Sequence, residues 1–139
     1  MEDTHIEQIR TDLAWRIRHE VMYPNLSYDA IKLQNDGEGI HFGLFTGNQL
    51  TAVVSLFNVG NSYQFRKFAT IVDAQGKGYG SLLLNHIIDY VKTTGAEKLW
   101  CNSRVSAIGF YSKFGFIETD QHSVSNDIDF VIMELELNN

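Results

Sequence analysis

The chain has 139 residues, which is enough for one domain with a buried core but too few for two ordinary domains. Its formal net charge of −6 argues against a nucleic-acid-binding protein and is more compatible with a basic small molecule or an amine as substrate. A single cysteine excludes an internal disulfide, no apolar run has membrane-spanning length and no hydrophobic signal segment opens the chain, so a cytoplasmic protein outside the membrane is expected.

The first elements along the chain are a short strand and an amphipathic helix. Residues 5–10 are expected to form the strand. Apolar residues at four-residue spacing within residues 11–23 predict the helix, with Thr11 or Asp12 as its N-cap. Pro24 follows and should end or interrupt that helix.

The middle of the chain reads mainly as strands. Residues 27–39 are polar and ambiguous, and they leave room for a short helix over residues 28–33. Residues 40–59 predict two strands around a Gly47–Asn48 turn, because apolar and β-branched residues flank a two-residue turn signal. Residues 63–72 are rich in aromatic and β-branched residues and predict a further strand.

The second half predicts a strand–helix–strand crossover. Apolar residues from Leu83 to Val91 recur at helical spacing and indicate about four turns of helix, with Gly95 at the C-terminal cap. The elements that follow are a buried strand at 98–101, a short helix at 106–115 closed by Gly115, and strands at 116–120 and 128–137. Because such crossovers are right-handed, the strands ending at Val72 and Cys101 should be parallel and the rest largely antiparallel, which gives an α+β fold.

The glycine-rich segment "QGKGYGS", residues 75–81, lies between a predicted strand and a predicted helix. The first turn of a helix exposes backbone N–H groups, and glycines before it allow an anion to approach them. A Walker loop would need Ser or Thr after Lys77, where Gly78 stands, and a dinucleotide fingerprint would need glycine at Ser81. Phosphate binding and a mere flexible turn before the helix are the two interpretations of this segment taken alone.

Two motifs together resemble the GNAT-type N-acetyltransferase superfamily. Residues 75–80 match its [Q/R]-x-x-G-x-[G/A] signature. Residues 99–116 resemble its second hallmark, a strand followed by A-x-x-F-Y-x-K-x-G-F. The matching positions of that second motif are Ala107, Phe110, Tyr111, Lys113, Gly115 and Phe116. The resemblance is close over residues 63–116 and elsewhere rests on the order of the elements.

This resemblance implies that residues 1–139 form one N-acetyltransferase domain with a mixed, mostly antiparallel sheet, two splayed parallel strands and flanking helices. It implies acetyl-CoA as the acyl donor and a primary amine of a small molecule or peptide as the acceptor, and it leaves room for a homodimer. The residues that it places at the acetyl-CoA site are Ala69, Thr70, Gln75, Gly76, Lys77, Gly78, Tyr79, Gly80, Ser81, Asn102, Phe110 and Lys113.

Amide formation from a thioester needs a neutral amine and a proton for the departing thiolate. Tyr111 lies where the family often keeps a tyrosine near the thioester sulfur, and a phenol is a suitable acid because its pKa exceeds that of a typical thiol. The alternative is a core aromatic on a helix face. Many relatives carry a glutamate base on the strand before the glycine loop, and this sequence has Arg66 and Lys67 there instead. A water chain or one of Glu20, Asp36 and His41 could serve as the base.

Other functions are less well supported by the residues. The five histidines show no paired spacing with Cys101, so no metal site is expected, and Cys101 lies in an apolar strand where a buried inert thiol is the usual outcome. Two alternatives to the enzyme remain. One is a non-catalytic acyl-CoA-binding regulatory module, motivated by the absent strand glutamate, and the other is a small nucleotide-binding protein.

Overall fold

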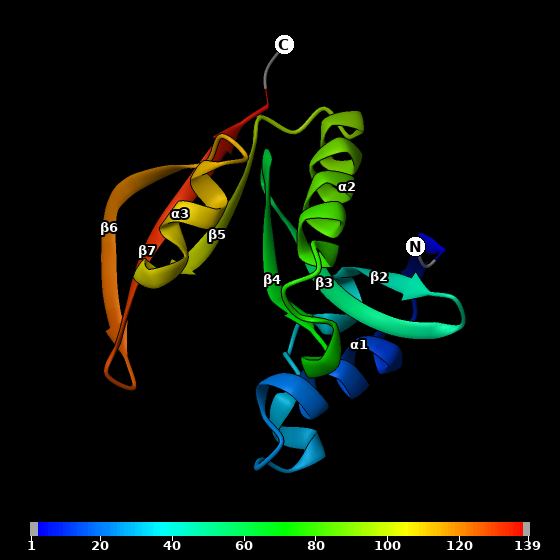
Figure 1. The fold of residues 1–139 in the computed structure, drawn as a ribbon. Helices are drawn as coiled ribbons and strands as arrows, with labels where there is room; N and C mark the ends of the chain where they lie inside the picture. Colours follow the sequence, from blue (N-terminus) through cyan, green and yellow to red (C-terminus); the bar gives the residue numbers. More distant parts are fainter. Residues whose placement is uncertain (1–2, 138–139) are drawn as a thin grey trace.

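A computed structural model describes residues 3–137, and its strands form one seven-stranded sheet in the order β1-β2-β3-β4-β5-β7-β6 (Figure 1). The strands are β1 (Thr4–Ile9), β2 (Ile40–Thr46), β3 (Gln49–Val59), β4 (Ser62–Thr70), β5 (Lys98–Arg104), β6 (Ile117–Ser125) and β7 (Ile128–Glu136). The α-helices are α1 (Thr11–Ile17), α2 (Tyr79–Thr93) and α3 (Ile108–Ser112). The short helical turns are η1 (Arg18–Met22), η2 (Tyr28–Ile31), η3 (Asp36–Glu38), η4 (Val72–Ala74) and η5 (Val105–Ala107).

The order of elements and the strand directions confirm the predicted α+β fold. Neighbouring strands are antiparallel except β4 and β5, which α2 connects and which run parallel. The Gly47–Asn48 turn joins β2 and β3 as predicted, and Gly95 follows α2 with a φ of +81°. In the described part of the chain, no helix is long and apolar enough to cross a membrane.

The two faces of the sheet carry different helices. Leu83, Leu84 and Ile87 of α2 pack with Val54 of β3 in the larger apolar cluster. Ala14 and Ile17 of α1 pack with Val53 in a second cluster. Because successive residues of a strand point to opposite faces, α1 and α2 cover opposite faces of the sheet.

Several predicted boundaries need correction. Neither Thr11 nor Asp12 caps α1, since Arg10 occupies the N-cap position and its side chain pairs with Asp12. The chain continues past α1 as a π-helical turn to Met22, so the predicted helix changes its geometry before Pro24. Strands β5 and β6 are longer than their short apolar segments predicted, because β7 pairs with both along its length.

The parallel strands β4 and β5 separate after a short contact. They pair only from Ser62 to Gln64 and from Lys98 to Trp100. Figure 1 shows the two strands close at the top of the view and diverging below it. A β-bulge in β4 at Lys67, whose φ is +56°, increases the local twist of the strand. From Phe65 onward, the edge of β4 that would face β5 therefore has no strand partner.

Candidate active site

A cleft of about 510 Å³ opens where β4 and β5 diverge. Its lining comes mainly from β4, β5, the end of η1, α3 and the β6–β7 hairpin. Phe65, Phe68 and Tyr111 form an aromatic wall, while Arg66, Lys67 and Arg104 add positive charge. A buried aromatic surface beside a charged one suits a molecule with an apolar arm and a polar reacting end.

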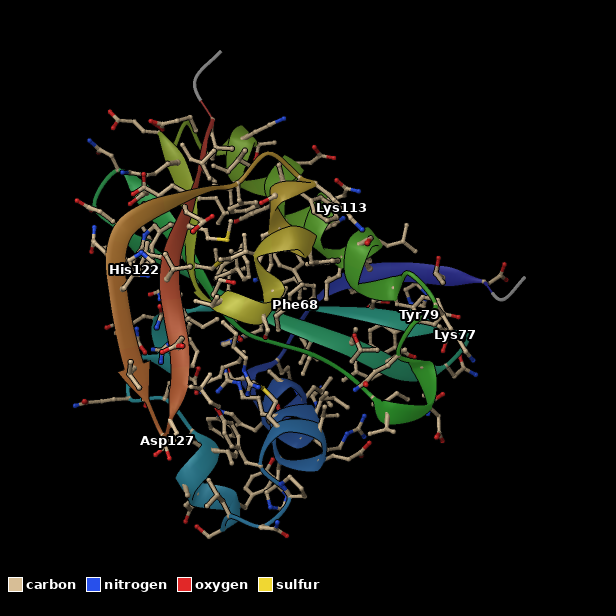
Figure 2. All side chains as sticks on the ribbon, turned by 60° about the vertical axis from the view of Figure 1, so that its left-hand side comes forward. Phe68, Lys77, Tyr79, Lys113, His122 and Asp127 are labelled. Carbon is tan, nitrogen blue, oxygen red and sulfur yellow. The ribbon has the colours of Figure 1, made fainter. Side chains whose placement is uncertain are left out.

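The glycine loop at the start of α2 has the geometry of an anion cradle. Gly76 and Gly78 have φ values of +78° and +88°, and a Cβ added at either would meet no atom within 4 Å. Gly78 is the N-cap of α2, and no acidic side chain lies in the first turn of that helix. The helix start therefore offers backbone N–H groups and partial positive charge to an anion. Lys77 is exposed at the loop, beside Tyr79 (Figure 2).

The loop is tied to the end of β4. The side-chain amide of Gln75 donates a hydrogen bond of 2.9 Å to the Thr70 carbonyl oxygen. Ala69 and Thr70 pair with Val53 and Ala52 of β3 along one edge of β4. Their other edge faces the cleft side, where β5 has already diverged. An extended ligand arm can therefore add its amides to that edge in the manner of a strand.

Two further residues predicted at the loop lie in the first turn of α2. Gly80 stands near Phe68, since an added Cβ would lie 3.5 Å from the Phe68 ring. Ser81 is half-buried in the same turn. Both positions are therefore close to the junction between the loop and the aromatic wall.

Tyr111 of α3 lies in the cleft among aromatic rings. Its ring centroid is 5.6 Å from that of Phe65 and 5.2 Å from that of Phe110. Burial, with a smaller effect of neighbouring Cys101, raises the pKa of the Tyr111 phenol well above its usual value. Phe110 also approaches Phe68 at 6.5 Å, and the exposed Lys113 follows at the end of α3 (Figure 2).

Cys101 and Asn102 of β5 also line the cleft. Cys101 is buried as predicted, and burial raises the pKa of its thiol to about 12. Asn102 is exposed, close to where β5 leaves β4. A thiol with such a pKa holds its proton at neutral pH, so Cys101 is a poor nucleophile.

The three candidate bases do not line the cleft. Glu20 is exposed on η1. Asp36 is buried and accepts hydrogen bonds of 2.7 and 2.8 Å from the Arg18 guanidinium. His41 is buried too, with Nε2 donating to the Asp36 carbonyl oxygen at 3.0 Å and Nδ1 2.7 Å from Ser55 Oγ. Both ring nitrogens are thus engaged inside the protein.

Tyr23 and Arg104 are among the cleft residues that were not predicted from the sequence. Tyr23 accepts a hydrogen bond of 2.6 Å from Lys67 Nζ, and that ammonium lies 4.8 Å from the centroid of the Tyr23 ring. Arg104 comes from the end of β5. From the sequence, Arg66 and Lys67 stand out only as replacements for a glutamate. Alternation along the strand could have placed Arg66 on the face opposite that of the apolar Phe65, and the structure shows that this is the α1 face.

The sequence model of the family described as "Acetyltransferase (GNAT) domain" matches residues 5–137. The chain belongs to the GNAT acetyltransferase family. The match spans both motifs and nearly all of the described fold. GNAT membership, together with relatives named as N-acetyltransferases, identifies an acetyl-CoA-dependent N-acetyltransferase and disfavours the nucleotide-binding alternative.

Individual relatives agree with this GNAT assignment. The uncharacterized N-acetyltransferase YitI of Bacillus subtilis strain 168 is 28% identical over 122 residues, which cover 81% of this chain and 82% of YitI. The ribosomal-protein-S18-alanine N-acetyltransferase of Escherichia coli superposes with a TM-score of 0.81 at 22% identity, covering 99% of this chain and 96% of that one. A GNAT acetyltransferase of Elizabethkingia anophelis, solved with acetyl-CoA bound, gives a TM-score of 0.79 at 19% identity, over 99% of this chain and 100% of that one.

No group of three or more His, Cys, Asp or Glu side chains that could hold a metal ion occurs within residues 3–137. The donor acetyl-CoA fits the residues that are present. The loop offers an open anion cradle at Gly76 and Gly78, and the free edge of β4 offers amide partners to an extended arm.

Proposed function

We propose that this GNAT protein transfers the acetyl group of acetyl-CoA to a primary amine of a small molecule or peptide by direct attack on the thioester. The observation that carries the proposal is the placement of Tyr111 in the cleft formed by the splayed strands, with the glycine loop at the neighbouring helix start. The loop residues 75–81 hold the pyrophosphate through backbone N–H groups. Ala69, Thr70 and Asn102 contact the extended arm, and Phe110 and Lys113 flank it from α3.

In this proposal Tyr111 protonates the departing thiolate. The phenol is protonated at neutral pH, since even its ordinary pKa of about 10 lies well above 7 and burial raises the pKa further. The amine forms its new bond to the acetyl carbon, the carbon–sulfur bond breaks, and the phenolic proton goes to the sulfur. The phenolate then recovers a proton from water. The cleft lining holds no Asp or Glu within the described residues, so the amine loses its proton to water rather than to a carboxylate.

The acceptor can be a small amine or the N-terminus of a peptide. The second alternative is favoured by the likeness to the Escherichia coli enzyme, whose name gives an alanine of a ribosomal protein as its acceptor. The proposal is tested by incubating the protein and acetyl-CoA with an amino acid, a diamine, a monoamine that has no other charged group, and a peptide that begins with alanine. Thiol release and the mass of the product are the measurements.

Acetylated product from at least one amine is the expected result. Tight CoA binding without turnover on any of the four classes would overturn the proposal and support a non-catalytic acyl-CoA-binding module instead. A parallel calorimetric titration with CoA, ATP and NAD should show that CoA binds best.

Three further features belong to this proposal. Residues 1–139 act as one N-acetyltransferase domain, which is supported by the single sheet that contains all seven strands. The protein acts in the cytoplasm, since its one cysteine is a buried free thiol suited to a reducing compartment. Light scattering after size-exclusion chromatography tests the homodimer, for which the two edge strands β1 and β6 offer pairing edges.

A further inference from the structure

The acceptor side of the cleft carries positive charge that the composition of the chain conceals. The chain has a net charge of −6, yet the cleft lining includes Arg66, Lys67 and Arg104 and, among described residues, no Asp or Glu. Within residues 3–137, the side chains of Arg66 and Arg104 have no hydrogen-bond or ion-pair partner. Their guanidinium groups are therefore available to a ligand.

The strand register places these two arginines on one face of the sheet. Arg66 lies opposite Ser55, whose hydroxyl contacts Arg18 at the end of α1, so Arg66 is on the α1 face. On β5, Leu99 and Cys101 pack in the core on the α2 face, and alternation turns Asn102 and Arg104 to the α1 face. The two guanidinium groups thus enter the cleft from the same side.

The glycine loop serves the opposite side. Helix α2 packs on the face that holds Phe65 and Leu99, and the loop lies at its start. Phe65 and Tyr111, two members of the aromatic wall, therefore separate the anion cradle from the arginines. Because the donor phosphates have their own cradle, the arginines remain for the other substrate.

No acidic residue of the nearby hairpin is part of the cleft lining within the described residues. Ser123 and Ser125 line the cleft, and Val124 between them points to the other face of the sheet. Asp129 pairs with Val124, so the Asp129 side chain also lies on that other face. Asp127 lies at the hairpin tip (Figure 2). Lys67 is held in place by Tyr23 at 2.6 Å and adds a third fixed charge.

We infer that the preferred acceptor is an amine that also carries a carboxylate or a phosphate, bound by Arg66 and Arg104 with Lys67 beside them. A guanidinium presents paired N–H donors that match the oxygens of either anion. This inference rests on the proposed function and specifies its substrate class. It also reverses the expectation of a basic substrate from the net charge, because the local field in a cleft and not the overall charge meets the ligand.

The test compares matched amines with and without the anion. Alanine is compared with alaninamide, and phosphoethanolamine with ethanolamine, by kcat/KM at saturating acetyl-CoA. The anionic member of at least one pair should be preferred by about tenfold or more. The pair that shows the larger ratio tells whether a carboxylate or a phosphate is the recognised group.

Variants then connect this preference to the arginines. Arg66→Gln and Arg104→Gln should each reduce the preference about tenfold or more through KM for the amine, with the Kd of CoA unchanged. Arg104→Glu should favour the member of each pair that lacks the carboxylate or phosphate. Lys92→Gln, an exposed change on α2, is the matched control and should leave the preference as it is. The compared quantity is the ratio of kcat/KM between the two amines of a pair. Because the same two amines are used with every variant, their difference in basicity cancels.

Each alternative result has a clear meaning. If the amine without the anionic group, or a diamine, is the better acceptor, the inference is wrong while the acetyltransferase proposal stands. The same holds if both Gln variants keep the preference for the anionic amine. Weaker CoA binding in the Gln variants would assign the arginines to the donor and would also overturn it. Failure to acetylate any amine would contradict the proposed function itself.

Discussion

Arg18 and Asp36 form a two-armed ion pair that is sealed inside the protein. Arg18 Nη1 lies 2.7 Å from Asp36 Oδ2 and Nη2 lies 2.8 Å from Oδ1, while the two side chains are 0% and 2% exposed. Trp15 Nε1 and the backbone N–H of Leu33 also donate to this carboxylate. The pair joins the end of α1 to the η3 turn that precedes β2.

The first prediction is that Asp36→Asn destabilises the fold strongly. The change keeps the shape of the side chain but leaves the buried Arg18 charge without its counter-ion, which typically costs about 3–5 kcal/mol of unfolding free energy. Urea unfolding of the wild type and the variant measures this loss of unfolding free energy. Asp12→Asn breaks the exposed pair with Arg10 and should change stability little. Equal effects of the two variants would show that burial of the pair does not matter.

This pair also predicts an acid dependence of stability. Burial raises the pKa of Asp36, but hydrogen bonds from Arg18, Trp15 and the Leu33 amide outweigh it and lower the pKa from 3.8 to about 2. A group with a lowered folded-state pKa stabilises the fold above its unfolded pKa and loses that effect as pH falls. The stability difference between wild type and Asp36→Asn should therefore shrink between about pH 4 and pH 2.

The glycine loop predicts a selective loss of CoA binding. Gly78→Val forces a branched side chain into a φ of +88° and places it at the helix start, where it blocks the approach of a phosphate to the amides. CoA binding measured by calorimetry should disappear. Gly47→Val is the matched control, since Gly47 also has a positive φ, +59°, and open space around it, but lies in the β2–β3 turn. The control should lose some stability and keep its affinity for CoA.

The acid role of Tyr111 predicts a specific kinetic signature. Tyr111→Phe removes the hydroxyl and keeps the ring that packs against Phe65 and Phe116. Turnover should fall about 10²–10⁴-fold while the Kd of acetyl-CoA changes little. Tyr90→Phe, which alters a hydroxyl on α2 beside Phe42, should have no such effect. Full turnover of Tyr111→Phe, with damage only in Tyr111→Ala, would assign a packing role to the ring.

Direct transfer predicts that Cys101 carries no acetyl group. Its thiol lies in the cleft, but burial raises its pKa to about 12, so the thiolate is scarce at neutral pH. Intact mass after mixing with acetyl-CoA alone should match the unmodified protein. Cys101→Ala should retain turnover within a few-fold. An acetylated protein that passes its acetyl group to an amine would instead show a two-step mechanism through this cysteine.

The sequence by itself determined the elements that are encoded in contiguous residues. The glycines of residues 76–80 and the apolar spacing from Leu83 to Val91 predicted a loop and helix, because backbone freedom and helical periodicity are local properties. The parallel direction of β4 and β5 followed from the short crossover between them. Placing Tyr111 after β5, on a short helix, needed only the second motif.

Only the tertiary structure decided which side chains meet. Asp36 in the polar stretch and His41 at the start of a predicted strand were candidate bases, but Arg18 and Ser55, distant in sequence, hold them in a buried network. Arg66 and Arg104 come together because strand register puts them on one face and because β4 and β5 separate after Gln64. Register and splay depend on packing between remote segments, which a local pattern of residues does not encode.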